Sequence, residues 1–98
     1  MSNLSEHAVN IWYDEWLSLQ KVIHTLHSAR DKGVKVPMEE AIAHYESFVT
    51  EELLPTNGAE RLAFIKARPA QYACYRQLDE LYKETKKRIA RVRIQRNK

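Results

Sequence analysis

Apolar side chains recur at helical spacing along most of the chain. In the first segment, from about Leu4 to Lys32, they follow one another at steps of four, three, four and three residues, at Trp12, Trp16, Leu19, Ile23 and Leu26. This spacing places them on one stripe of a helix. Asn3 and Glu6 have the spacing of a capping box at its start, and Gly33 is expected to end it.

Prolines divide the middle of the chain. Pro37 suits the first turn of a second helix, which is expected to reach Leu54 because the following Pro55 disfavours helix in the residue before it. The segment 55–58 reads as a loop. A short helix is predicted over 59–67, where Asn57 and Glu60 repeat the spacing of a capping box.

A third long helix is predicted from Pro69 to about Gln95, unless Pro69 only kinks a helix that began earlier. Its apolar stripe consists of Cys74, Leu78, Leu81, Thr85, Ile89 and Val92. Such a helix is about 40 Å long at 1.5 Å per residue. Since the other helices are shorter, we expect its last three or four turns to project from the body.

The pattern as a whole predicts an all-α fold of three long helices and one short one. With two glycines among 98 residues, the chain lacks the turns that sandwiches, barrels and βαβ units require. Its length suits one domain, residues 1–98. We expect Leu19, Ile23 and Leu81 to be buried in its core.

Charge is distributed unevenly along the chain, although the net charge is only +3. Residues 1–82 contain eight Lys/Arg and twelve Asp/Glu, which makes an acidic body. Residues 83–98 contain Glu84 and eight basic residues, namely Lys83, Lys86, Lys87, Arg88, Arg91, Arg93, Arg96 and Lys98. The sequence therefore predicts an acidic body with a basic C-terminal helical extension.

The candidate chemistry argues against an enzyme. The chain contains no nucleophile elbow and no glycine-rich phosphate loop, and it has the single cysteine Cys74, which is expected to be buried and inert. His24 and His27, with His44 or Glu46 opposite, could hold a metal, but polar surface residues are the favoured interpretation. We expect no cofactor, no membrane span, no signal peptide and a cytoplasmic location.

The basic C-terminal segment is the main candidate for partner binding. It can be a solvated helix end, a contact for nucleic-acid phosphate, or an arm that docks on an acidic protein surface. The docking arm is favoured, because a protein groove would neutralise the charge and cover the apolar stripe. The expected contact residues are Lys83, Lys86, Lys87, Arg88, Ile89, Arg91, Val92, Arg93 and Arg96.

Two further segments carry weaker signals. Trp12 and Trp16 are expected in the core, although one of them, or Tyr13, could instead anchor a partner. Arg68, Pro69 and Ala70 form either a simple helix break or an exposed bend that a prolyl isomerase recognises.

The chain as a whole resembles small early proteins of temperate bacteriophages. The resemblance rests on four features: its size, the solitary Cys74, the aromatic and acidic first helix around Trp12–Trp16, and the basic C-terminal helix. It is most similar in these features to the anti-RecBCD accessory proteins of lambdoid phages, and anti-CRISPR proteins share them. The resemblance implies binding to the host RecBCD nuclease, contact of Pro69 with a host cyclophilin-type prolyl isomerase, and no catalytic residues.

The expected function is therefore that of a non-enzymatic protein that binds and modulates a host DNA-processing enzyme. The alternative is a nucleic-acid-binding accessory protein that uses the basic C-terminal helix. A structural or assembly protein held by helix contacts is a third hypothesis. Direct binding to nucleic acid should weaken steeply as salt rises, whereas a protein-docking arm should show little affinity for free DNA.

Overall fold

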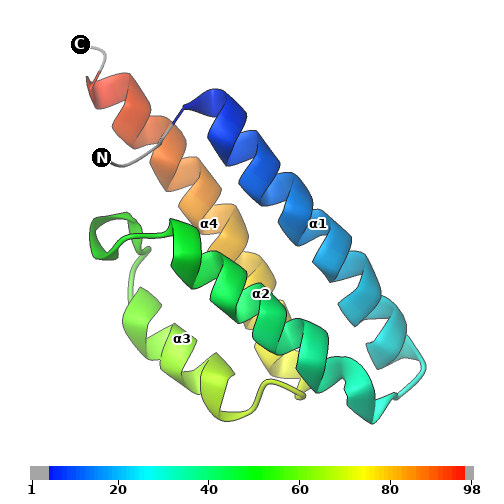
Figure 1. Cartoon of the computed structure of the whole chain (residues 1–98). Coiled ribbons are helices and arrows are strands. Elements are labelled where there is room, and N and C mark those ends of the chain that lie inside the picture. Colours follow the sequence, from blue (N-terminus) through cyan, green and yellow to red (C-terminus); the bar gives the residue numbers. More distant parts are fainter. Residues whose placement is uncertain (1–4, 97–98) are drawn as a thin grey trace.

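Four helices make up most of the computed structural model, which describes residues 5–96, with side chains for residues 5–93 (Figure 1). The helices are α1 (Glu6–Ser28), α2 (Lys35–Phe48), α3 (Gly58–Ala67) and α4 (Tyr72–Arg96). Two short 3₁₀ turns, η1 (Lys32–Val34) and η2 (Glu51–Leu53), lie between them. Since the described residues contain no strand, the prediction of an all-α chain is confirmed. None of these helices is long and apolar enough to span a membrane.

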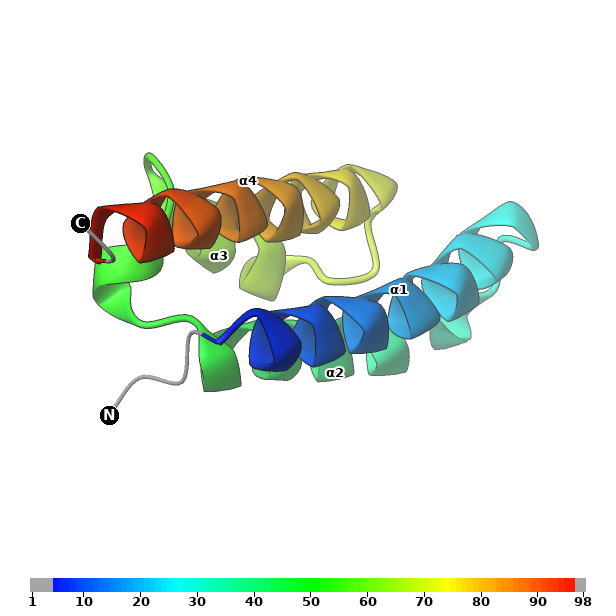
Figure 2. The same ribbon diagram turned by 90° about the horizontal axis from the view of Figure 1, so that it is seen from above.

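Consecutive helices run in opposite directions, and α1 lies beside both α2 and α4 (Figure 1). Seen from above, α1 and α2 form one layer and α3 and α4 form the other (Figure 2). Contacts at the pairs Glu6–Arg93, Tyr13–Lys86 and Gln20–Asp79 fix the antiparallel register of α1 and α4. Each pair is seven residues, or about two helical turns, from the next.

Aromatic rings fill the middle of the core. Trp16 is 0% exposed and stacks on Tyr82 of α4, with ring centroids 4.2 Å apart and an interplanar angle of 3°. Trp12 stacks on Phe48 of α2 at 4.9 Å. The Tyr82 hydroxyl donates to the carbonyl oxygen of Ala41 at 2.7 Å, so this ring ties α4 to α2.

The predicted core residues are buried to different degrees. Ile23 and Leu81 are each 0% exposed, which confirms their prediction. Leu19 is only half-buried and packs against the edge of the core. The prediction that Leu19 is fully buried is therefore wrong, although its side chain does lie on the core side of α1.

The ends of α1 differ from their prediction. Asn3 lies outside the described residues, and the side chain of Ser5 caps the helix by accepting from the backbone N–H of Ala8 at 3.1 Å. Gly33 does not end the helix. Arg30, with φ of 55°, takes the left-handed position of a Schellman motif, in which the Arg30 and Asp31 amides donate to His27 and Leu26.

The second helix is shorter than predicted. It begins at Lys35, with Pro37 in its first turn, and it ends at Phe48 because Val49 adopts an extended backbone. The η2 turn that follows buries Leu53, which is 1% exposed. Asn57 precedes α3 in the left-handed conformation and makes no side-chain capping bond, so the predicted capping box is absent there.

The predicted projection of the C-terminal helix is wrong for the described side chains. Ile89 is 0% exposed, and Val92 packs against the core. The N-terminal half of α1 runs alongside this part of α4, and η2 contacts it as well (Figure 1). The basic segment is therefore a packed part of the bundle and not an extension of it.

Candidate functional site

The C-terminal half of α4 separates charge from apolar surface. Ile89 and Val92 face the core, whereas the cationic side chains lie at its flanks and outer surface. Six of them are described, and together we call them the α4 basic face: Lys83, Lys86, Lys87, Arg88, Arg91 and Arg93. The side chain of Arg96 lies outside the described residues. The exposed surface of this half-helix is thus cationic, while its apolar stripe packs against the core of the protein.

The flank of the α4 basic face that lies toward α1 is held by contacts with that helix and with α4 itself. The Lys83 ammonium pairs with Asp79 at 2.9 Å, and Asp79 also accepts from the Gln20 amide at 2.9 Å. The hydrogen bond to Asp79 raises the pKa of Lys83. The Lys86 ammonium lies over the ring of Tyr13, 4.2 Å from its centroid, as a cation–π contact.

The opposite flank borders the loop between η2 and α3. Two nitrogens of the Arg88 guanidinium, Nε and Nη2, donate to the backbone carbonyl oxygen of Glu52 at 3.2 and 3.1 Å. A groove of about 330 Å³ opens beside it, lined by Pro55, Thr56, Glu84, Lys87, Arg88 and Arg91. Three of these six residues are basic and one is acidic.

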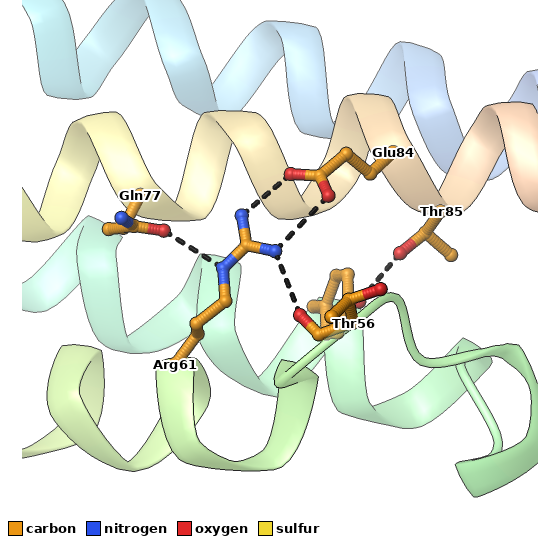
Figure 3. Close-up of polar contacts among 6 residues, drawn as sticks. Thr56, Arg61, Gln77, Glu84 and Thr85 are labelled. Atoms are coloured by element: carbon orange, nitrogen blue, oxygen red, sulfur yellow. Dashed lines mark hydrogen bonds and ion pairs between the residues drawn. The ribbon is translucent and has the colours of Figure 1, made fainter.

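Arg61 of α3 pairs with that acid. Its guanidinium binds the Glu84 carboxylate at 3.1 and 2.6 Å, donates to Gln77 at 3.0 Å and donates to the carbonyl oxygen of Thr56 at 3.2 Å (Figure 3). The hydrogen bonds between the two side chains lower the pKa of Glu84 and raise that of Arg61. The bidentate pair joins α3, the preceding loop and α4, and it compensates the carboxylate that borders the groove.

We expect Glu84→Gln to lower the free energy of unfolding at neutral pH by about 1 kcal/mol. The uncharged amide cannot form the charge-assisted, partly exposed pair that the Glu84 carboxylate forms with Arg61. The pKa of Glu84 is lowered in the folded state. Its contribution is therefore present above the ordinary glutamate pKa, and it is lost as the pH falls through the lowered value. In urea titrations the gap to the parent should narrow on acidification. A gap that stays constant, or an equal effect of the exposed control Glu80→Gln, would contradict this account.

Two of the three candidate aromatic anchors on α1 are buried in the core. Trp12 is 2% exposed and Trp16 is 0% exposed, as expected of core residues. Tyr13 is half-buried beneath Lys86, and its pKa is raised by burial and by the Asp79 charge. The α1 aromatic cluster therefore stabilises the bundle, and Tyr13 supports one cation of the α4 basic face.

Pro69 lies in the turn between α3 and α4, and α4 begins three residues later, at Tyr72. The break therefore separates two helices. Arg68 and Ala70 are exposed, but Pro69 is half-buried and lines a small groove with residues of α2 that include Ile42 and Glu46. The expected contact of this bend with a prolyl isomerase stays a prediction.

The remaining candidate residues have ordinary structural surroundings. Cys74 is buried, as predicted, and burial raises the pKa of its thiol. The His44 ring nitrogen Nε2 bonds the carbonyl oxygen of Trp12 at 2.9 Å, which links α2 to α1. No group of three His, Cys, Asp or Glu side chains within the described part of the chain is placed to hold a metal ion.

Sequence reasoning missed three contributors to the site: Arg61, Gln77 and the Thr56 carbonyl. They lie in a short helix, an early turn of α4 and a loop, so no single periodic pattern contains them. Glu84 was the one available signal, because it is the lone acid in a basic segment.

Comparison with known proteins finds one matching family and one partial relative by sequence, and no solved structure. The YpoC-like protein family matches residues 6–97. A Bacillus subtilis (strain 168) protein described as "Uncharacterized protein YpoC" is 58% identical over 33 residues, which make up 34% of this chain and 20% of that protein. The matched segment thus spans about a fifth of that relative's length. No solved structure matches the chain significantly.

Proposed function

The chain belongs to the YpoC-like protein family, and we propose that it is a non-enzymatic accessory protein that binds the phosphate backbone of double-stranded nucleic acid. The α4 basic face makes the contact. The carrying observation is that its apolar neighbours, Ile89 and Val92, are already covered by the protein's own helices. The side chains that remain exposed for a partner are cations, and exposed cations are sufficient for electrostatic binding of a polyanion.

This observation changes the balance between the two partner classes. A protein groove was favoured over nucleic acid because it would cover the apolar stripe as well as the charge. Since α1 and η2 contact this part of α4, that advantage is gone. Lys/Arg clusters on one face of a domain supply the electrostatic part of nucleic-acid binding.

The arrangement of acidic residues supports one direction of approach. Glu39 and Glu40 are exposed on α2, which belongs to the layer that does not contain α4 (Figure 2). A polyanion is repelled from that side and attracted to the α4 basic face. Such charge asymmetry steers encounter and orients the complex.

A duplex fits this face better than a single strand does. Single-strand platforms combine cations with aromatic side chains on which bases stack. Among the described residues the exposed aromatic side chains are Phe64 and Tyr72. Phe64 lies on α3, and Tyr72 lies in the first turn of α4, about 20 Å along the helix from Lys87 at 1.5 Å per residue. Among the described residues, the one ring shown against these cations is that of Tyr13, which is half-buried and covered by Lys86.

The same cations could also bind an acidic protein surface, which supports a second candidate function. In that case the chain modulates a host DNA-processing enzyme such as the RecBCD nuclease, as its resemblance to phage proteins implies. The two functions differ in whether the chain binds nucleic acid by itself. Only the first predicts affinity for a duplex with no other protein present.

The test is fluorescence anisotropy with labelled DNA duplexes of equal length and unrelated sequence. We expect all of them to bind with similar affinity, with Kd on the order of 10⁻⁶–10⁻⁴ M at physiological salt, because backbone contacts carry no sequence information. Single strands of the same length should bind more weakly. Inhibition of purified RecBCD by a chain that shows no affinity for free duplex at low salt would contradict the proposal and favour the second candidate.

A further inference from the structure

We propose that the groove beside Arg88 is a phosphate seat, which holds one internal phosphodiester group of the bound backbone between Lys87 and Arg91. This inference rests on the proposed function and gives it a defined point of contact. The groove has a volume of about 330 Å³ and is lined on its other side by Pro55 and Thr56.

The first argument is the state of the cations. Lys83 pairs with a carboxylate, Arg93 lies 3.8 Å from Glu6, and Lys86 lies over an aromatic ring. The side chains of Lys87 and Arg91, by contrast, are exposed, and among residues 5–93 neither makes a side-chain hydrogen bond or an ion pair within 4.0 Å. These two are therefore the members of the α4 basic face that give up no such contact with the described residues when they bind an anion.

The second argument is their spacing. Lys87 and Arg91 are four residues apart on α4, so their Cβ atoms are about 5–6 Å apart on the same side of the helix. Like charges at this spacing repel each other and destabilise the helix. A phosphate between them replaces that repulsion with two attractions, and both side chains are long enough to reach it.

The third argument is the treatment of the neighbouring charges. Arg88 is held in place by a neutral carbonyl oxygen, which fixes its guanidinium without cancelling its charge. Glu84, which would repel a phosphate, is compensated by the bidentate Arg61 (Figure 3). Lys87 acts on that carboxylate only through longer-range attraction. The groove thus keeps its positive potential although one of its lining residues is acidic.

A tetrahedral oxyanion in this groove could be an internal phosphodiester or a terminal phosphate monoester. The seat is open and continues into the rest of the α4 basic face, so we assign it the internal group. Closed circular and linear duplexes of the same sequence distinguish the two sources. Equal affinity per base pair supports the assignment, and a preference for linear DNA with 5′-phosphate ends overturns it.

The decisive variant is Lys87→Ala combined with Arg91→Ala, with Lys21→Ala combined with Lys35→Ala as the control. Both double variants lose two exposed positive charges, but the control residues lie on α1 and α2. The slope of log K against log salt for a DNA duplex should become shallower by about 2 in the first variant, at about 0.9 for each phosphate contact. The control should keep the parent's slope, and an equal change in both variants would overturn the seat.

Inorganic phosphate is the second probe, and it separates failure of the seat from failure of the proposed function. In NMR titrations of the full chain we expect phosphate to shift the amides of residues 55–56 and 84–91, and the Lys87/Arg91 variant should lose these shifts. Phosphate shifts without any duplex binding would reject the proposed function but keep the anion seat. Duplex binding with the parent's salt slope in the Lys87/Arg91 variant would reject the seat and keep the function.

Discussion

Trp16→Ala is expected to unfold the protein at moderate temperature. The indole is fully buried and stacked on Tyr82, and truncating it removes a large aromatic contact between α1 and α4. Replacing a buried tryptophan with alanine costs about 3–5 kcal/mol, compared with a total of about 5–15 kcal/mol for a small domain. Circular dichroism melts should therefore show either a strongly lowered midpoint or no cooperative transition.

Trp16→Phe keeps this prediction open to test where the alanine variant does not fold. Phenylalanine retains a ring against Tyr82, and it removes an indole N–H that is buried with no hydrogen-bond partner among the described residues. Its melt should lie between those of the parent and the alanine variant. Phe64→Ala is the control, because that ring is 50% exposed and its loss should cost about 1 kcal/mol or less. Equal melts for Trp16→Ala and Phe64→Ala would contradict the assigned core.

The largest expected effect on binding comes from changing Lys86, Lys87 and Arg91 together to Gln. At about 1 kcal/mol for each lost phosphate contact, duplex affinity at low salt should fall about 100-fold. None of these side chains pairs with a described carboxylate within 4.0 Å. Because Lys86 loses its cation–π contact with Tyr13, we expect the free energy of unfolding to fall by about 1 kcal/mol or less.

The matched control changes Lys21, Lys32 and Lys35 to Gln. Both triple variants reduce the formal net charge from +3 to 0, so they differ only in where the charge is removed. The control residues are exposed on α1, η1 and α2. If the control loses affinity as strongly as the α4 variant, binding follows net charge and not the α4 basic face.

Periodicity predicted which faces are buried because each helix carries its apolar stripe in its own sequence. Ile23, Leu81 and Cys74 could be placed in the core from spacing alone. Helix ends were less predictable, because more than one residue can take the left-handed conformation that ends a helix. Gly33 is the better left-handed residue by conformational preference. The chain nevertheless reverses at Arg30, three residues earlier, where Asp31 and Gly33 form the next turn.

The position of the basic segment could not be predicted, because it depends on how two distant helices align. The register in which Glu6 meets Arg93 brings the start of α1 beside the end of α4 and so covers Ile89. The Arg61–Glu84 pair likewise joins residues 23 positions apart. Nothing in either local sequence specifies the other partner. The sequence could therefore indicate the segment that carries the candidate site, but not which of its side chains are buried and which stay exposed.

The central claim, that the α4 basic face binds nucleic-acid phosphate, is tested most directly by the salt dependence of duplex binding. If all six described cations contact phosphate, the slope of log K against log salt for the parent chain should be about −5, at about 0.9 per contact. The Lys86/Lys87/Arg91 variant should give a slope of about −3. A slope near zero for the parent, or the same slope for both proteins, would contradict the claim.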